Sequence, residues 1–326
     1  MTIHLDSGVI TRLCDEDIAF DAARLALEGQ REGSFALPQR IDVNVATGFF
    51  RAMPAALGEY MGVKLMTLAK GVGNRYLLLV YSQKSGELLA TLDAAEVTRL
   101  RTAATTALAG RLLRPEGTTV LGLIGTGFEA EGHLRAFARM WPLEKVRVYS
   151  RSQDKRQEFA ERLGTALGLD IEPAADVAEV AGGAAVTVLC TKATEPVVDG
   201  RSFAPGAVVL SIGSTRPDLR ELDDAVFARA RAVLVDDPAS VLAESGDVKS
   251  AVASGAITPE SLVSMAGWSD DRAPAEGERD LLVFKSVGTA LQDLALAAVL
   301  MKSAAERGLG RDLGEITELK RAVRGK

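Results

Sequence analysis

The chain contains few of the residues on which several common chemistries depend. Of its 326 residues, only Cys14 and Cys190 are cysteines and only His4 and His133 are histidines. Two cysteines far apart in different sequence contexts exclude a disulfide framework and lack the spacing of zinc ligands, so we expect no metal site. The scarcity of histidine leaves few candidates for histidine-based catalysis, and we expect His133 to be packed or solvent-facing.

The chain also lacks an excess of positive charge and a long apolar stretch. Its 38 Lys and Arg side chains are outnumbered by 44 Asp and Glu, which gives a formal net charge of −6. An acidic chain of this kind is not expected to bind nucleic acid. No apolar run approaches the ~20 residues that span a bilayer, and residues 1–10 lack the pattern of a secretion signal. We therefore expect a cytoplasmic protein without a membrane partner.

A glycine-rich turn between an apolar run and a helical pattern is the most informative feature that is present. The run that begins at Thr118 ends in Gly125, Gly127 and Ala130. In a dinucleotide cradle, the first glycine allows the turn, the second lets a pyrophosphate approach backbone N–H groups, and the small third residue lets the helix pack on the strand. A following helix to about residue 140 and a strand over 145–149 supply the required context. We therefore predict cofactor contacts from Gly125, Thr126, Gly127, Phe128, Glu129 and Ala130.

Apolar patterns before this turn predict a separate domain. Asp15 is a candidate N-cap for a helix to about Gly33, and residues 40–90 carry short apolar runs separated by turns, which is typical of an antiparallel sheet. One hairpin turn is expected at residues 84–86. A helix capped by Asp93 then covers residues 94–113. The following strands are nearly continuous apolar runs, as expected of a parallel sheet covered on both faces: 185–190, 207–212 and 232–236.

These patterns together predict an α/β protein with two domains. We expect an α+β substrate-binding and dimerisation domain over 1–116, completed by the C-terminal segment 306–326. A Rossmann-type doubly wound parallel sheet is expected over 117–305, including a last helix over 286–305 that leads back toward the first domain. The polar stretch 268–279 is expected to be a mobile loop.

The tip of the second Rossmann strand indicates the cofactor. NAD enzymes usually place an acidic residue there to hold the ribose 2′-hydroxyl, whereas a 2′-phosphate requires Arg and hydroxyl donors. This chain has Ser150, Arg151 and Ser152 at that position and no acid. The prediction is that NADP(H) is preferred and NAD(H) possible.

Several short motifs occur in a fixed order along the chain, and with them the chain resembles the ornithine cyclodeaminase/μ-crystallin family over almost its whole length. The resemblance implies a bidomain fold, a homodimer, and redox chemistry at the α-carbon of an amino or imino acid. The motifs are Pro38-Gln-Arg40, Gly62-Val-Lys64, Leu100-Arg-Thr-Ala-Ala104, the glycine turn, Pro205-Gly206, residues 212–223, Glu244-Ser-Gly-Asp247 and Phe284-Lys-Ser-Val-Gly288.

Three cations are candidates for binding a substrate carboxylate. Arg40, Lys64 and Arg101 lie in segments otherwise rich in apolar residues, and a carboxylate needs such donors, preferably with the planar fork of arginine. The resemblance implies that these positions hold the carboxylate. It also implies that cofactor contacts extend to Thr102, Cys190, Thr191, Ile212 and Ser286. With no histidine nearby in sequence, Cys190 is not expected to be a nucleophile.

Thr215 is the informative departure from the family pattern. Cyclodeaminases carry an aspartate at this position that serves as general acid and base, whereas a threonine hydroxyl cannot hold a proton near neutral pH. It can hydrogen-bond an imine nitrogen or a water. This difference favours hydride delivery to a C=N bond, as in the ketimine reductases, with Lys64 or a water held by Thr215 as the proton source.

The expected function is an NAD(P)H-dependent reductase of cyclic imino acids, such as Δ1-pyrroline-2-carboxylate or Δ1-piperideine-2-carboxylate. The chemistry of hydride transfer belongs to the cofactor, and the protein supplies orientation and electrostatics. Three alternatives stay open: an ornithine cyclodeaminase, an alanine or other amino-acid dehydrogenase, and a ligand-binding protein of the μ-crystallin type without turnover.

Overall fold

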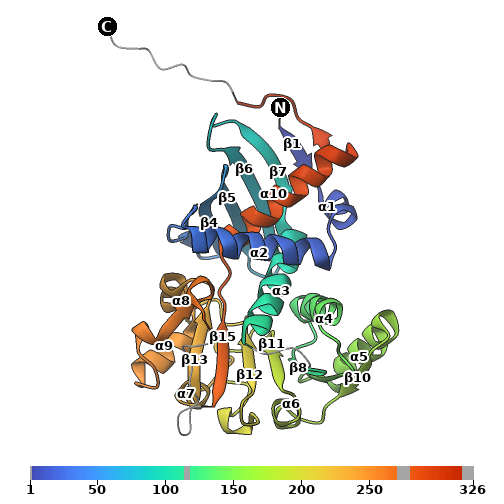
Figure 1. Ribbon diagram of the computed structural model, residues 1–326, viewed down its shortest axis with the longest axis vertical. Helices are drawn as coiled ribbons and strands as arrows, with labels where there is room; N and C mark the ends of the chain where they lie inside the picture. The colour runs from blue at the N-terminus through green and yellow to red at the C-terminus, as the bar shows by residue number, and fades with distance from the viewer. Residues whose placement is uncertain (1, 114–117, 270–279, 318–326) are drawn as a thin grey trace. The chain divides into compact units, whose positions relative to one another are not determined.

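The N-terminal part of the chain forms one sheet, the middle part forms a second, and the C-terminal part packs on the first again. The computed structural model describes residues 2–113, 118–269 and 280–317. Residues 1–98 and 290–326 form one compact unit, and residues 99–289 form the other (Figure 1). Part of the predicted loop 268–279, namely 270–279, and residues 318–326 of the C-terminal segment lie outside the described residues.

The first unit is a mostly antiparallel sheet with two long helices packed on it. The strand order is β16-β1-β7-β6-β5-β4-β2, and β3 also pairs with β4. Helix α10 packs on α2 and on strands β4 to β6. The elements are β1 (Ile3–Leu5), α1 (Ser7–Leu13), α2 (Glu16–Glu32), β2 (Phe35–Ala36), β3 (Ile41–Val45), β4 (Gly48–Leu57), β5 (Tyr60–Ala69), β6 (Gly73–Ser82), β7 (Leu88–Asp93), α10 (Ala290–Arg307) and β16 (Arg311–Asp312).

Local sequence signals explain the ends of α2 and α3. The Asp15 carboxylate accepts a hydrogen bond from the N–H of Ile18, and Gly33 ends α2 in the left-handed conformation with φ 72°. Asp93 accepts from the N–H of Ala95 at 3.2 Å at the start of α3 (Ala94–Leu113). Both predicted helices are therefore confirmed, as is the predicted turn between β6 and β7.

The second unit is a parallel sheet with helices between its strands, as predicted. The strand order is β10-β9-β8-β11-β12-β15-β13-β14. Its strands are β8 (Val120–Ile124), β9 (Lys145–Tyr149), β10 (Asp170–Pro173), β11 (Val186–Leu189), β12 (Val208–Ser211), β13 (Ala230–Val235), β14 (Leu262–Ser264) and β15 (Leu281–Lys285). Its helices besides the end of α3 are α4 (Phe128–Met140), α5 (Gln153–Leu167), α6 (Val177–Gly183), α7 (Asp224–Ala228), α8 (Pro238–Glu244) and α9 (Gly246–Ala253), with short 3-10 turns η1 (Gly200–Ser202), η2 (Pro259–Ser261) and η3 (Met265–Gly267).

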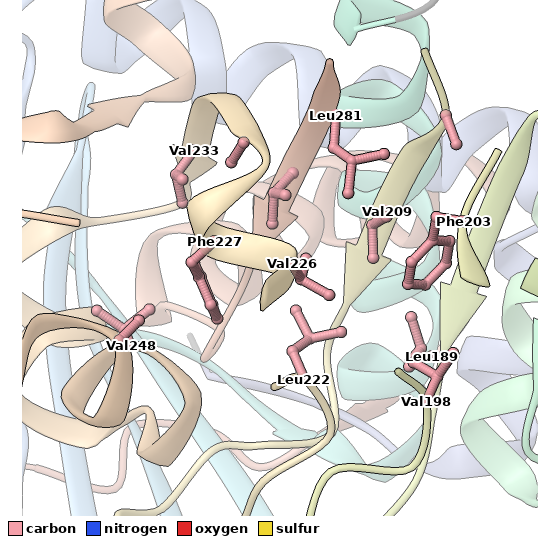
Figure 2. Packing of buried hydrophobic residues seen from close by; sticks show 14 of the residues in the cluster. Leu189, Val198, Phe203, Val209, Leu222, Val226, Phe227, Val233, Val248 and Leu281 are labelled. Carbon is pink, nitrogen blue, oxygen red and sulfur yellow. The ribbon is translucent and has the colours of Figure 1, made fainter. Parts of the chain in front are cut away.

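An apolar core fixes the strands of this second sheet. Figure 2 shows Val209 of β12 beside Phe203, with Val226 of α7 and Leu222 close by. These four side chains are 0–2% exposed, and burial of each large apolar side chain stabilises the fold by roughly 1.5–3 kcal/mol. The core therefore anchors the segments that leave the carboxyl ends of β11 and β12.

The last long helix differs from the sequence expectation in its start and in its unit. It begins at Ala290, not at residue 286, because residues 286–289 form an irregular segment whose polar groups bond to Asp236. The contacts place α10 in the first unit, whereas we expected it to belong to the Rossmann domain. The physical reason is its apolar surface, which packs on α2 and the first sheet.

The part of α3 from Arg99 onward belongs to the second unit, so the division at residue 98 also precedes the predicted boundary at 116. None of the helices in the described part of the chain combines the length and the apolar character that a membrane span requires.

Candidate active site

The turn between β8 and α4 has the geometry of a dinucleotide cradle. Gly125 has φ 121°, and a Cβ there would lie 2.7 Å from the carbonyl oxygen of Cys190, so only glycine fits. A Cβ on Gly127 would meet no described protein atom within 4 Å, which leaves room for a phosphate beside the backbone. Ala130 is fully buried against the strand. The residues present therefore fit the pyrophosphate of a dinucleotide.

The start of α4 presents backbone donors and an exposed aromatic ring. Gly127 caps the helix without a side-chain hydrogen bond, so the first-turn N–H groups point outward for an anion. Phe128 is 57% exposed, and the guanidinium carbon of Arg99 lies 5.4 Å from the centre of its ring. Thr126 and Glu129 are half-buried beside them.

The tip of β9 carries the residues expected to select the cofactor. The Ser150 hydroxyl donates to the carbonyl oxygen of Ser152 at 3.1 Å, and Ser152 caps α5 by accepting from the N–H of Lys155. Arg151 is exposed at this tip. Arg156 donates to the Ser150 carbonyl oxygen at 2.8 Å and so fixes the segment from the helix side.

The segments after β11 and β12 lie next to each other at the carboxyl edge because the two strands pair in parallel. Cys190 and Thr191 follow β11, and Ile212 and Thr215 follow β12. Burial raises the pKa of the Cys190 thiol well above its usual value, and the carboxylates of Glu221 and Glu129 raise it further. A thiol held in its neutral form is a poor nucleophile.

Ser286 and Arg101 lie near a buried carboxylate after β13. The Ser286 hydroxyl and the Gly288 N–H each donate to Asp236 Oδ2 at 2.7 Å. Burial raises the pKa of Asp236, and these donors oppose the rise. A Cβ on Gly288 would lie 2.5 Å from Arg101 Nη1, so the guanidinium packs directly against this backbone. Arg101 therefore packs against the segment that contains Ser286, and Ser286 is hydrogen-bonded to Asp236.

Lys64 forms a buried ion pair that the sequence did not reveal. Its Nζ lies 3.0 Å from Asp293 Oδ1 and 3.1 Å from Oδ2, and the two side chains are 2% and 0% exposed. The strand pairing places Lys64 opposite Met53, on the sheet face that α10 covers. Tyr76 of β6 adds its ring 5.4 Å from Nζ.

Arg40 lies close to a second ion pair in the same unit. Arg51 donates through Nε and Nη2 to the two oxygens of Asp42, at 2.7 and 2.6 Å. These bonds, and the nearby charge of Arg40, lower the pKa of Asp42. The strand register places Arg51 on the same sheet face as Lys64, so two buried cations share that face.

His133 is packed, one of the two roles expected for it. Its Nδ1 lies 2.7 Å from the carbonyl oxygen of Glu129 and its Nε2 lies 3.0 Å from Thr106 Oγ1. Thr106 in turn donates to the carbonyl oxygen of Thr102 at 2.9 Å. The ring therefore joins the first turn of α4 to the part of α3 that carries Thr102.

Sequence reasoning missed Asp293, Asp236, Glu221 and Arg51. Glu221 lies within the motif of residues 212–223, but its residue type alone indicated no role. Asp236 directly follows an apolar strand, as active-site carboxylates often do, and that position was a usable signal. Asp293 has a partner 229 positions away and offers no local signal.

The comparisons with known proteins agree with this geometry. The model of the ornithine cyclodeaminase/mu-crystallin family matches residues 8–308. The chain belongs to this family.

Three known proteins are similar to this chain over most of its length. The ketimine reductase mu-crystallin of Mus musculus is 34% identical over 282 residues, which cover 83% of this chain and 86% of that protein. The structure of Thermococcus litoralis Δ1-pyrroline-2-carboxylate reductase with NADH and L-proline has a TM-score of 0.87 at 26% identity, covering 95% of this chain and 100% of that chain. An archaeal alanine dehydrogenase dimer with bound NAD also has a TM-score of 0.87, at 27% identity over 95% and 98% of the chains.

Proposed function

We propose that this chain reduces cyclic imino acids, Δ1-pyrroline-2-carboxylate or Δ1-piperideine-2-carboxylate, to L-proline or L-pipecolate. The observation that carries the proposal is Thr215 on the segment after β12, where cyclodeaminases have an acid. The broader class is confirmed: the chain is a nicotinamide-dependent oxidoreductase that acts on imino or amino acids. When bound, the cofactor supplies the hydride for the C=N carbon.

The protein's own residues would bind the substrate and deliver the proton. We assign the carboxylate to Arg40, Lys64 and Arg101, because two guanidinium groups and an ammonium suit a planar anion. The imine nitrogen needs one proton as the carbon receives the hydride. Lys64 is suited to this because Asp293 stabilises its charged form, and the Thr215 hydroxyl can hold a water or the nitrogen itself.

NADPH is the proposed cofactor. Ser150, Arg151 and Ser152 stand at the tip of β9 without an acid, and exposed Arg151 can reach a 2′-phosphate. The variant Arg151→Ala should weaken NADPH binding roughly tenfold or more and leave NADH binding almost unchanged, since a bond to a charged group contributes about 1.5–3 kcal/mol. Equal dissociation constants for the two cofactors in the wild type would refute the preference.

The deciding experiment compares substrates under identical conditions. We expect the wild type to oxidise NADPH with either cyclic imine and to release negligible ammonia from L-ornithine. Ammonia release from ornithine at a competitive rate would favour the cyclodeaminase, and turnover of pyruvate with ammonia would favour an alanine dehydrogenase. NADPH binding without turnover of any of these would favour the ligand-binding alternative.

A homodimer through the first sheet is a further proposal. The face of this sheet opposite α10 exposes Ile41, Val43 and Val45 of β3, which are 54–62% exposed. The strand register adds Phe50, opposite Val43, and Leu77 of β6 on the same face. A contiguous apolar face of this kind commonly marks an interface, and the alanine dehydrogenase relative is a dimer.

A further inference from the structure

The carboxylate of Glu221 joins the two segments that follow β11 and β12. Its side chain is fully buried. Oε1 accepts from the N–H of Thr191 and, at 2.8 Å, from the Thr191 hydroxyl. Oε2 accepts from the Ser211 hydroxyl and from the Gly213 N–H, both at 2.7 Å. Oε1 thus accepts hydrogen bonds from the segment after β11, and Oε2 accepts them from the end of β12 and the segment that follows it.

The backbone of Glu221 is itself fixed. Asp247 Oδ1 accepts from the N–H groups of Glu221 and Leu222, at 2.7 and 3.0 Å. The Glu221 carbonyl oxygen accepts from the N–H of Val197 at 2.9 Å. Leu222 is buried in the apolar core, where Figure 2 shows it near Val226. The carboxylate therefore projects from a rigid support.

The negative charge of Glu221 is stabilised within the same cluster. Lys285 Nζ donates to Ser211 Oγ at 2.9 Å and lies 3.2 Å from Asp247 Oδ2, with both charged side chains 0% exposed. A buried carboxylate is costly unless hydrogen bonds and a counter-charge compensate it. Backbone N–H groups and hydroxyls supply that compensation for Glu221, and the ammonium of Lys285 pairs with Asp247 and is linked to Glu221 through Ser211.

The two segments are also packed so closely that neither can shift alone. A Cβ on Gly213 would overlap the carbonyl oxygen of Thr191 and Oε1 of Glu221. The backbone at Gly213 therefore packs directly against both Thr191 and the Glu221 carboxylate.

These segments lie where a Rossmann sheet holds the second half of a dinucleotide. In the order β10-β9-β8-β11-β12, the switch point falls between β8 and β11, and ligands bind at the carboxyl ends there. With the pyrophosphate held at the glycine turn after β8, the segments after β11 and β12 would face the nicotinamide half.

We infer that Glu221 is a positioning residue that sets the nicotinamide-side segments of Thr191 and Gly213. The inference rests on the proposed cofactor and goes beyond the proposed substrate. It does not require Glu221 to touch the cofactor, because its effect passes through the two segments.

The test is the variant Glu221→Gln, measured by binding rather than turnover. A glutamine amide has one acceptor oxygen, so in either orientation its NH₂ faces the donors of one segment. The dissociation constants of NADH and NADPH should rise roughly tenfold or more. Those of ADP-ribose and its 2′-phosphate, which lack nicotinamide, should change less than about twofold.

Asp280→Asn is the matched control. Asp280 pairs with Arg229 at 2.8 Å just before β15 begins, at the opposite, amino-terminal edge of the sheet. Its loss removes a partly buried ion pair without touching the two segments. We expect both kinds of ligand to bind this variant as they bind the wild type.

Two outcomes would overturn the inference: unchanged binding of the intact cofactors by folded Glu221→Gln, or equal weakening of both kinds of ligand. Circular dichroism checks the fold. If Glu221→Gln does not fold, Ser211→Ala and Thr191→Val each remove one donor hydroxyl and should weaken only the intact cofactors, by roughly two- to tenfold. A wild type that binds NADPH but reduces no cyclic imine would refute the proposed function and leave this binding test intact.

Discussion

At the scale of single residues, the buried ammonium of Lys64 is paired with the carboxylate of Asp293. Lys64 and Asp293 are almost fully buried and 3.0 Å apart. Removing one partner of such a pair leaves an uncompensated charge, which costs roughly 3–5 kcal/mol. We predict a loss of that order in the free energy of unfolding of Asp293→Asn, measured with urea near pH 7.

The same variant should show a pH dependence of stability at alkaline pH that arises from Lys64. Without the Asp293 carboxylate, burial disfavours the protonated form of Lys64, so the unfolded chain binds that proton more readily and stability should rise with pH. The double variant Lys64→Met/Asp293→Leu should recover most of the loss. Glu28→Gln is the control, because its pair with Arg24 is exposed and 3.8 Å long, and it should change stability by less than about 0.5 kcal/mol. A near-neutral Asp293→Asn would show that the pair does not hold Lys64 charged.

His133 predicts a second pH dependence of stability. Burial lowers its pKa to about 4, from an ordinary value of 6.5. Because its folded pKa is lowered, the unfolded chain binds more protons below about pH 6.5, and stability falls as pH falls toward 4. The contribution lost between about pH 7 and pH 5 is on the order of 2 kcal/mol. His133→Gln should reduce the wild-type slope over that range by this amount, and an unchanged slope would contradict the assignment.

Residue types predicted which positions bind a cofactor or a carboxylate, but they did not indicate which buried partners hold these residues. Thr191 was predicted as a cofactor residue, yet Glu221, which holds it, is 30 positions away. Lys64 was predicted as a substrate residue, yet nothing in the sequence around Asp293, 229 positions away, indicated that it is the partner of Lys64. Ion pairs across long sequence separations depend on tertiary packing, which local patterns do not encode.

At the scale of elements, alanine substitutions at the two glycines of the cradle should affect different properties, stability at Gly125 and ligand affinity at Gly127. Gly125 has φ 121° and no space for a Cβ, so Gly125→Ala should lower the melting temperature by several degrees. A Cβ on Gly127 would meet no described atom within 4 Å, so Gly127→Ala should fold normally. Because the methyl group would occupy the space of the phosphate, the variant should bind NADH and ADP-ribose roughly tenfold or more weakly. Thermal unfolding and ligand titration separate the two. Normal affinity of Gly127→Ala for both ligands would place the pyrophosphate elsewhere.

Elements with strong local signals were predicted well, and elements that depend on packing were not. Capping residues and apolar periodicity located α2 and α3 nearly to the residue. The short strands β1 and β16 were missed, because each is defined only by pairing with a neighbour from a distant part of the chain. The start of α10 was also missed, since Ser286 and Gly288, which precede it, are held by hydrogen bonds to Asp236 in place of helical ones.

At the scale of the whole molecule, the order of strands explains why the domain boundaries were misplaced. Strand β15 is the last strand of the second sheet in sequence, yet it lies between β12 and β13 and not at an edge. Alternation of strands and helices predicted a parallel sheet but not this insertion. The helix that follows β15 is apolar enough to fit either domain, and only its contacts with α2 and β4 to β6 assign it to the first.

From the exposed apolar face of the first sheet, we predict that the chain is a homodimer in solution and that β3 lies in its interface. Val43 is 54% exposed and opposite Phe50 in the β3–β4 register. A charge at an apolar interface must be desolvated without a partner, so Val43→Asp should convert the dimer to a monomer in sedimentation equilibrium. Leu25→Asp is the control, because Leu25 is 40% exposed on α2 and should leave the dimer intact. A monomeric wild type, or a Val43→Asp variant that stays dimeric, would remove β3 from the interface.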